Sequence, residues 1–365
     1  MSSLRVGIVG LPNAGKTTLF NALSRAGAQV ASYPFTTVEP NVGVVAVPDD
    51  RLERIADLAG CGRRVPSTVR FVDIAGLVEG ASKGEGLGNR FLANIREVDA
   101  VVHVVRAFES GDVSHVEGSV DPVRDAGLIE TELRLADLEV LGRLLSKARQ
   151  AAKSGDRESQ SKVELLQRLE EQVSGGGCLA GRGSPAGDLL LTVPDAQLLS
   201  LKPTLIALNV GESPRESDEY ERRMKEWAAP GNIPVVTANA EIEAELAELD
   251  PGEAAEFEKE MGIEEESLAR IVEASYRLLG LITFFSIDSG ECRAWPVPEG
   301  SSAAYAAGRI HTDFETGFVK AEVVHQDDFL ACGSFSAARD GGALRVEGRE
   351  YIVQDGDVMH FKFAT

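Results

Sequence analysis

The sequence predicts an α/β fold: a mostly parallel sheet covered by helices, with a helical insertion and a small C-terminal domain. Short apolar runs of strand length occur at residues 4–9, 69–74 and 100–105, and segments with helical spacing lie between them. Continuous apolar strands that alternate with helices indicate a parallel sheet that is buried on both faces. From residue 122 the chain becomes rich in Leu, Glu and Arg, and from residue 281 it consists of short strands and turns. These changes predict two further parts beside the α/β domain.

The bulk composition is that of a globular protein with two or three domains. The chain has 365 residues, of which 43% are hydrophobic and 26% are charged, and no apolar run reaches the length of a membrane span. The first strand begins close to Met1, which predicts that there is no signal peptide and that the protein is cytoplasmic. The four cysteines are widely spaced and form no metal-binding or C-x-x-C pattern, so we expect reduced thiols. A net charge of −21 argues against broad non-specific binding to nucleic acids but does not exclude a local basic face.

The most informative segment follows the first strand. Residues 10–17 fit the phosphate-binding pattern G-x-x-x-x-G-K-[ST], and the next residues read as the start of a helix. The glycines let the backbone curl so that its N–H groups point at phosphate oxygens, helped by the helix N-terminus. Lys16 would reach the β- and γ-phosphates, and the hydroxyl of Thr17 would bind Mg²⁺. The strand-loop-helix context argues against an ordinary glycine turn.

Two further segments indicate a γ-phosphate site. Residues 73–76 fit D-x-x-G at the end of a strand, where Asp73 would reach the metal and the N–H of Gly76 would sense the γ-phosphate. In the loop at residues 33–40, either Thr36 or Thr37 could close over Mg²⁺, and the residues alone do not separate the two.

The residue that orients the attacking water is less clear from the sequence. Switch GTPases often carry glutamine directly after D-x-x-G, but this chain has Leu77, which cannot polarise water. Either the intrinsic turnover is slow or another side chain replaces the glutamine. His115, in the loop after the strand at 100–105, is a candidate, and a merely solvated side chain is the alternative. His103 lies within that strand and is expected to be structural.

The candidate segment for recognition of the base is residues 209–212, N-V-G-E, which follow an apolar strand. Guanine-specific proteins carry N-K-x-D at this place. Here Val210 replaces the lysine and Glu212 replaces the aspartate, so guanine specificity is in doubt. Adenine offers an amine donor and a ring-nitrogen acceptor, which Asn209 and nearby backbone could satisfy.

The remaining segments complete the predicted order of elements. The stretch from about 122 to 173 has helical spacing with a polar interruption at 153–159, which predicts two antiparallel helices joined by a turn. Sheet-like sequence resumes at 203–209 and 233–237, so the helical pair is an insertion within the nucleotide domain. A helix follows at about 264–279. Strands are then expected at residues 282–285, 319–324, 351–353 and 360–363.

With these segments assembled, the chain resembles the YchF family of Obg-related P-loop NTPases from end to end. The resemblance rests on residues 7–17, on residues 33–41 and on the block at 73–97, which contains the specific sequence GASKGEGLGN. Residues 307–314 and 353–359 resemble the family's TGS domain, a ubiquitin-like β-grasp module. The implied architecture is a Ras-like, OBG-type G domain at 1–121 and 201–280, a coiled-coil-like helical insertion at 122–200 and a TGS domain at 281–365.

The resemblance implies hydrolysis of ATP in preference to GTP, because N-x-x-E replaces the guanine motif. It places the metal on Thr17, Thr37 and Asp73, sets Val210 against the base, and suggests His115 as the residue that positions water. The implied nucleotide contacts are Asn13, Ala14, Gly15, Lys16, Thr17, Thr18, Gly76, Asn209, Val210 and Glu212. Members of the family are associated with ribosomes and with translational or stress regulation. The implied partners are therefore ATP and the ribosome, with the subunit undetermined, or another translation-related protein; neither a membrane nor sequence-specific DNA is expected.

The sequence departs from the family pattern at two places, and other functions remain open. Ala14 stands where the family mostly has Val, and T-A-N at residues 237–239 stands where related proteins have S-A-K, which makes the loop beside the base less certain. One alternative is a GTP-specific switch with the same fold. Another is a small-molecule phosphotransferase, which would need an acceptor pocket and a base beyond Asp73. A third is a binding module without activity, which Leu77 allows but Lys16 and Thr17 oppose.

Overall fold

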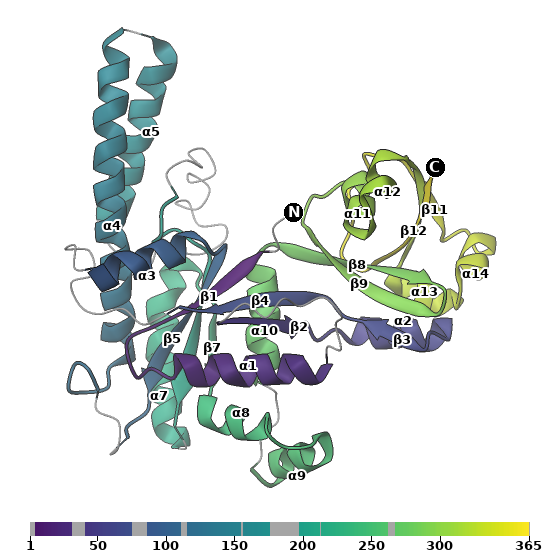
Figure 1. Ribbon diagram of the computed structural model, residues 1–365, viewed down its shortest axis with the longest axis horizontal. Coiled ribbons are helices and arrows are strands. Elements are labelled where there is room, and N and C mark those ends of the chain that lie inside the picture. Colours follow the sequence, from purple (N-terminus) through teal and green to yellow (C-terminus); the bar gives the residue numbers. More distant parts are fainter. Residues whose placement is uncertain are drawn as a thin grey trace. The chain divides into compact units, whose positions relative to one another are not determined.

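A computed structural model describes residues 4–30, 41–74, 86–110, 115–154, 156–175, 197–211, 213–261 and 267–364. The chain divides into two compact units (Figure 1). The first unit comprises Met1–Val45 and Arg70–Leu278, and the second comprises Ala46–Val69 and Leu279–Thr365. No helix in these described ranges is both long and apolar enough to cross a membrane.

The first unit is built on a six-stranded sheet. In spatial order its strands are β2 (Val42–Ala46), β4 (Thr68–Asp73), β1 (Arg5–Val9), β5 (Ala100–Ala107), β6 (Thr204–Val210) and β7 (Val235–Ala238). The pairings from β4 through β7 are all parallel, which confirms the predicted mostly parallel sheet. Parallel strands end at the same edge of a sheet, and ligands bind at that edge in folds of this kind. The phosphate-binding loop, Asp73 and Asn209 all lie there.

The first unit also contains helices, some of which cover this sheet. They are α1 (Lys16–Val30), α3 (Gly86–Arg96), α4 (Pro122–Ala151), α5 (Arg157–Ser174), α7 (Pro214–Ala228), α8 (Ala240–Leu246), α9 (Pro251–Met261) and α10 (Ser267–Leu278). Helices α3, α4 and α7 pack on the face that carries Val9, Val101 and Val105. Helix α10 packs against β5, β6 and β7, while α1 packs against β1 and α8.

Helix α4 packs against the sheet with its first half and against α5 with its second half. Asp121 caps its N-terminus and Pro122 begins its first turn, and its first half buries Ile129 and Leu133 against the sheet. Its second half leaves the sheet and packs against α5 through a separate apolar cluster, which includes Leu145 and Leu169 (Figure 1). The two predicted helices are thus present, and the first of them is also a helix of the α/β core.

A buried carboxylate fixes the segment that returns from this hairpin. Asp137 on α4 accepts hydrogen bonds from the N–H groups of Leu199 and Ser200, at 2.8 and 2.7 Å, and from the hydroxyl of Ser200 at 2.7 Å. Burial raises the pKa of Asp137, and these three hydrogen bonds oppose that shift. The chain therefore re-enters the sheet at a defined place.

The second unit contains another six-stranded sheet. Its strands, in spatial order, are β11 (Arg345–Glu347), β10 (Phe318–His325), β12 (Asp357–Phe363), β8 (Leu281–Asp288), β9 (Glu291–Pro298) and β3 (Arg63–Val65). The final strand β12 runs parallel to β8, which itself forms an antiparallel hairpin with β9. This arrangement agrees with the β-grasp fold that the family resemblance implies.

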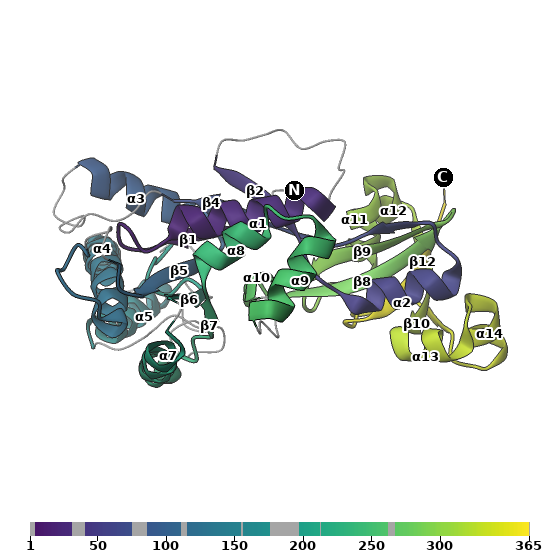
Figure 2. The same cartoon turned by 90° about the horizontal axis from the view of Figure 1, so that it is seen from below.

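Helices lie on both faces of the second sheet. Helices α11 (Ala303–Ile310) and α12 (Thr312–Thr316) pack on one face, and α2 (Asp50–Ala59), α13 (Gln326–Cys332) and α14 (Phe335–Asp340) occupy the other (Figure 2). The first face buries Phe284 and Phe361, and the second buries Phe285 and Phe329.

Residues 46–69 are placed differently from the sequence-based domain boundaries, which put them in the first domain. Leu52 and Ile55 on α2 lie in one apolar cluster with Phe285, and β3 pairs with β9 in parallel. The apolar face of α2 thus has its core partners in residues more than 200 positions later in the sequence. A strand was also expected at 351–353, where the structure has one isolated bridge between Ser302 and Ile352.

Candidate nucleotide-binding site

The phosphate-binding loop has a backbone that only glycine tolerates at two positions. A Cβ on Gly10 would lie 2.4 Å from the carbonyl oxygen of Val104 in β5. Gly15 has a φ of +91°, and a Cβ there would lie 2.2 Å from Nδ2 of Asn209. Asn13 between them is also left-handed, with a φ of 63°. The loop is therefore curled tightly against β5 and against the end of β6.

Lys16 lies inside this curled loop at the first residue of α1. It is 8% exposed, and its Nζ donates a hydrogen bond to the carbonyl oxygen of Leu11 at 2.7 Å. Burial lowers the pKa of Lys16, and the nearby carboxylate of Asp73 raises it. The loop thus holds a poorly hydrated cation, whose attraction for an anion is stronger than it would be in water.

Thr17 and Asp73 meet beside this cation. The hydroxyl of Thr17, in the first turn of α1, donates a hydrogen bond to Oδ2 of Asp73 at 3.1 Å. Asp73 ends β4 opposite Ile8 of β1, so the two neighbouring strands place both groups at the sheet edge. A hydroxyl and a carboxylate are hard oxygen ligands, and this pair suits Mg²⁺. Thr37, the third expected ligand, lies outside the described residues, as does Gly76.

The side chain of Asn209 connects the phosphate-binding loop to the start of α8 by hydrogen bonds. It is 6% exposed, its Nδ2 donates to the carbonyl oxygen of Ala14 at 3.0 Å, and its Oδ1 accepts from the N–H of Ala240 at 3.0 Å. The amide therefore ties the phosphate-binding loop to the start of α8. Both ends of the Asn209 amide are thus hydrogen-bonded to backbone groups, and its expected contact with the base stays a prediction. Its long-range partner Ala240 could not be found from the sequence.

The rest of the base motif is only partly described. Val210 is half-buried and packs against the apolar cluster beneath α7, whose members include Met224 and Ala228. Glu212 lies outside the described residues. Thr18 is exposed beside Thr17 in the first turn of α1, where its backbone could meet a phosphate.

His115 is buried, which excludes the solvated alternative. Its side chain is 7% exposed, and its Nε2 lies 2.7 Å from Oδ2 of Asp125 on α4. The N–H of Glu117 donates to Nδ1 at 3.0 Å, so Nδ1 carries no proton and Nε2 is the nitrogen that donates to Asp125. Arg124 donates to the other oxygen of this carboxylate, from Nε at 2.9 Å and from Nη2 at 2.8 Å. In this arrangement both ring nitrogens of His115 are engaged within the segment that leads into α4.

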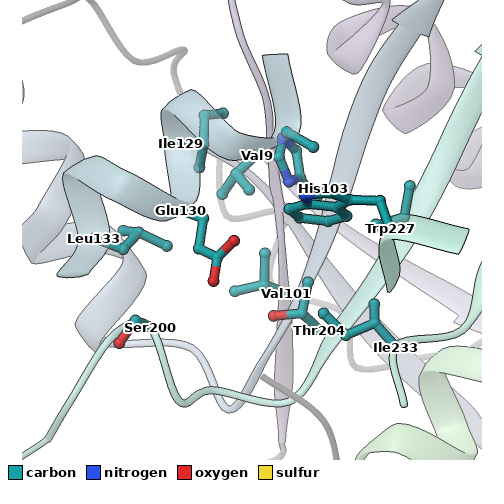
Figure 3. Close-up of a pocket in the computed structure, with 12 residues that line it drawn as sticks. Val9, Val101, His103, Ile129, Glu130, Leu133, Ser200, Thr204, Trp227 and Ile233 are labelled. Carbon is teal, nitrogen blue, oxygen red and sulfur yellow. The ribbon is translucent and has the colours of Figure 1, made fainter. Parts of the chain in front are cut away.

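A cavity of about 40 Å³ lies on the face of the sheet that α4 and α7 cover. Figure 3 shows Glu130 from α4 and Trp227 from α7 on its sides, and its lining comprises Val9, Val101, His103, Ala126, Ile129, Glu130, Leu133, Ser200, Thr204, Ile206, Trp227 and Ile233. The volume accommodates a few water molecules. Burial, and to a lesser degree the charge of Lys16, lowers the pKa of His103 to about 4, so this imidazole is neutral at pH 7. His103 is thus part of the core, as expected.

Comparison with known proteins identifies the family. The chain is 48% identical over 359 residues to the "Ribosome-binding ATPase YchF" of Haemophilus influenzae, covering 98% of this chain and 99% of the relative. The chain belongs to the YchF family. Another YchF relative, from Bacillus subtilis, carries the same description and is 45% identical, with 99% of both chains covered.

Family models and solved structures agree with the YchF assignment. A model described as "50S ribosome-binding GTPase" matches residues 5–130, and the YchF-GTPase C-terminal model, described as "Protein of unknown function (DUF933)", matches residues 281–364. The solved YchF GTPase of Schizosaccharomyces pombe superposes with a TM-score of 0.87 at 33% identity, covering 99% of this chain and 98% of that one. The motif-based resemblance is therefore confirmed. The relatives from Haemophilus influenzae and Bacillus subtilis are named ATPases, whereas the family model and the Schizosaccharomyces pombe structure are described as GTPases.

Proposed function

We propose that this YchF protein binds and hydrolyses ATP in preference to GTP, and that its nucleotide state changes its affinity for the ribosome. The observation that carries the proposal is the curled loop with its buried cation, Lys16, beside the Thr17–Asp73 oxygen pair. Support for the ribosome comes from relatives described as ribosome-binding ATPases that match this chain from end to end. A ribosomal partner would be met in the cytoplasm, and this is the location that the proposal assigns to the protein.

Phosphate binding follows from the loop itself. The ammonium group of Lys16 donates to the carbonyl oxygen of Leu11, and it would transfer that hydrogen bond to the β- and γ-phosphates of ATP. A charged phosphate oxygen is a stronger acceptor than a carbonyl, so the exchange is favourable. Backbone N–H groups of residues 13–18 at the start of α1 would hold the remaining oxygens. Because these donors are fixed before the nucleotide arrives, little reorganisation is needed as charge develops in the transition state.

Mg²⁺ fits the oxygen pair of Thr17 and Asp73, and Thr37 would complete the protein ligands. The metal supplies neutralisation of charge on the β- and γ-phosphates. In the described conformation the Thr17 hydroxyl donates to Asp73, so it must turn its lone pairs outward to act as a ligand. Gly76 would add an N–H group near the γ-phosphate.

Preference for adenine would come from the loop that follows β6. Asn209 holds that region to the phosphate-binding loop, which fixes the distance between base and phosphates. Val210 stands where GTP-specific proteins have the lysine that packs along guanine, and Glu212 stands where they have the aspartate that binds it. This combination favours ATP.

His115 would position the attacking water, and this role requires a change of conformation. Its Nε2 donates to Asp125 and its Nδ1 accepts from Glu117, so a water could bind the ring only after one of these contacts opens. Slow intrinsic turnover follows, and a partner that opens the contact would accelerate hydrolysis.

The test combines phosphate release with ribosome sedimentation. The full chain should release phosphate from ATP faster than from GTP, into water and without any metabolite acceptor. Lys16→Ala should abolish release, while Lys225→Ala, an exposed cation on α7, should leave it unchanged. Sedimentation with purified ribosomes should differ between the ADP and the non-hydrolysable ATP-analogue states. Faster release from GTP would replace the proposal with a GTP-specific switch, and a requirement for a small acceptor would replace it with a phosphotransferase.

A further inference from the structure

Arg106 is a buried cation at the carboxyl edge of the first sheet. It is the last residue but one of β5 (Ala100–Ala107), and it is 3% exposed. Burial of a charged side chain is costly unless hydrogen bonds or other charges compensate for the lost hydration. The other residues of β5 are apolar except His103, so the packing of this strand does not require a cation. Arg106 therefore has a role at this edge that an apolar side chain would not fulfil.

The guanidinium of Arg106 holds Phe108, which is the first residue after β5. Its Nε donates a hydrogen bond to the carbonyl oxygen of Phe108 at 3.0 Å. Its Cζ lies 4.5 Å from the centre of the Phe108 ring, which is within the range of a cation–π interaction. Both contacts are strengthened because Arg106 is shielded from water. One side chain thus fixes both the backbone and the ring of Phe108.

Phe108 lies against the segment that carries the base motif. In the parallel pairing of β5 with β6, Ala107 is opposite Val210. Phe108 and Gly211 are the residues that follow this pair. A Cβ on Gly211 would lie 3.1 Å from Cβ of Phe108, so the two residues approach each other closely. Phe108 is therefore in contact with the middle of the N-V-G-E segment.

The place of Phe108 in the fold suits a wall of the base site. The phosphate-binding loop follows β1 and the base motif follows β6, and β5 lies between these two strands in the sheet. Phe108 is half-buried, so part of this residue stays accessible at the sheet edge. A purine presents a flat apolar face, and an aromatic side chain is a suitable surface for it.

We propose that Arg106 is a positioning residue for the base of the nucleotide: it holds Phe108 against the N-V-G-E segment, so that the ring forms one wall of the base site. This inference rests on the proposed function, because it requires a nucleotide whose base lies beside residues 209–212. Arg106 acts through Phe108 and not on the phosphates, which Lys16 and the metal ligands would hold. Loss of Arg106 should therefore weaken binding of the base and leave the hydrolysis step unchanged.

The test separates the base from the phosphates. The full chain and the variants R106M, R106K, F108A, R106M/F108A and R106K/F108A are titrated by calorimetry with ATP and with inorganic tripolyphosphate, which has no base, each with Mg²⁺. Phosphate release gives kcat and KM for ATP, and circular dichroism verifies that each variant folds.

Lys202→Met is the matched control for the loss of a partly buried cation. The Nζ of Lys202 donates to the carbonyl oxygens of Arg96 and Val98. Lys202 precedes β6 (Thr204–Val210), so it lies at the opposite end of that strand from the base motif. The Lys202→Met variant should bind ATP with a Kd within about twofold of that of the wild type.

We expect Arg106→Met to raise the Kd and the KM of ATP about tenfold or more, because the Phe108 ring loses the group that holds it. The kcat and the Kd of tripolyphosphate should change by less than about twofold, since neither depends on the base. Phe108→Ala should weaken ATP binding by a similar factor, and the double variant should bind no more weakly than Phe108→Ala alone. Arg106→Lys keeps the charge but not the guanidinium, and should weaken ATP binding about threefold or more only while Phe108 is present.

An unchanged Kd of ATP in Arg106→Met would overturn the inference and leave the proposed function standing. Equal losses of affinity for ATP and for tripolyphosphate would also refute it, because Arg106 would then support the phosphate-binding loop. Additive losses in the double variant would show that Arg106 does not act through Phe108. If Arg106→Met does not fold, Arg106→Lys decides by the same three criteria. If the wild type binds GTP more tightly than ATP, the proposed preference for ATP fails, and the same set of variants titrated with GTP decides the role of Arg106.

Discussion

The buried histidine of β5 gives a pH dependence of stability that can be worked out in advance. His103 is 7% exposed, and burial first and the charge of Lys16 second lower its pKa to about 4. An unfolded histidine has a pKa of about 6.5. Between pH 6.5 and about pH 4, His103 therefore binds a proton in the unfolded chain but not in the folded protein. The contribution of His103 to the free energy of unfolding is therefore fully present above pH 6.5 and is lost as the pH falls from 6.5 towards 4.

The expected loss follows from the two pKa values. Between pH 7 and pH 5 the free energy of unfolding should fall by about 2 kcal/mol through His103 alone, and by about 3 kcal/mol at pH 4. The assay is urea unfolding followed by the fluorescence of Trp227, which lines the same cavity (Figure 3). A Trp295→Phe background removes the other tryptophan, which lies in the second unit.

His103→Gln is the matched control, because glutamine does not titrate. Subtracting its change in stability between pH 7 and pH 5 removes the contribution of carboxylates and leaves that of His103. The difference between the two proteins should be about 2 kcal/mol. Parallel pH profiles would refute the reasoning, since they would mean that His103 is equally free to accept a proton in both states.

Three substitutions test the nucleotide site. Gly15→Ala should cost about 1–3 kcal/mol of stability and weaken ATP binding at least tenfold, because of its φ of +91° and the 2.2 Å approach to the Asn209 amide; unchanged affinity by calorimetry would contradict this. Asn209→Ala should destabilise the fold by about 2–4 kcal/mol in chemical unfolding, because two buried backbone groups lose their partners, and a cost below about 0.5 kcal/mol would show that the amide does not hold the loop. His115→Ala should lower kcat for ATP about tenfold or more, measured by phosphate release, while the Kd of ATP stays the same; an unaltered kcat would remove the water-positioning role.

The sequence alone predicted those parts of the nucleotide site that consist of contiguous residues. The loop at 10–17 and the pairing of Thr17 with Asp73 were expected because a fixed pattern follows one strand and a second pattern ends its neighbour. Parallel strands bring such ends together, so the position of Asp73 could be inferred before the structure was known.

Long-range partners could not be inferred in this way. The amide of Asn209 donates to Ala14 and accepts from Ala240, which are far apart in the sequence. The base motif predicts a contact with the nucleotide and gives no sign of these two hydrogen bonds. His115 is held by Asp125, and an acid ten residues away in a helix gives no signal of such a contact. Helix α2 buries Leu52 and Ile55 in the core of the second unit, and nothing in its own sequence indicates to which core it belongs.

The most direct test of the central claim is a calorimetric titration of the nucleotide-free full chain with ATP and with GTP, each with Mg²⁺. The account predicts tighter binding of ATP, because Val210 and Glu212 replace the residues that guanine requires while Asn209 holds the loop for either base. Equal or tighter binding of GTP would contradict it, and would mean that Glu212 accepts from guanine and that the protein is a GTP-dependent switch.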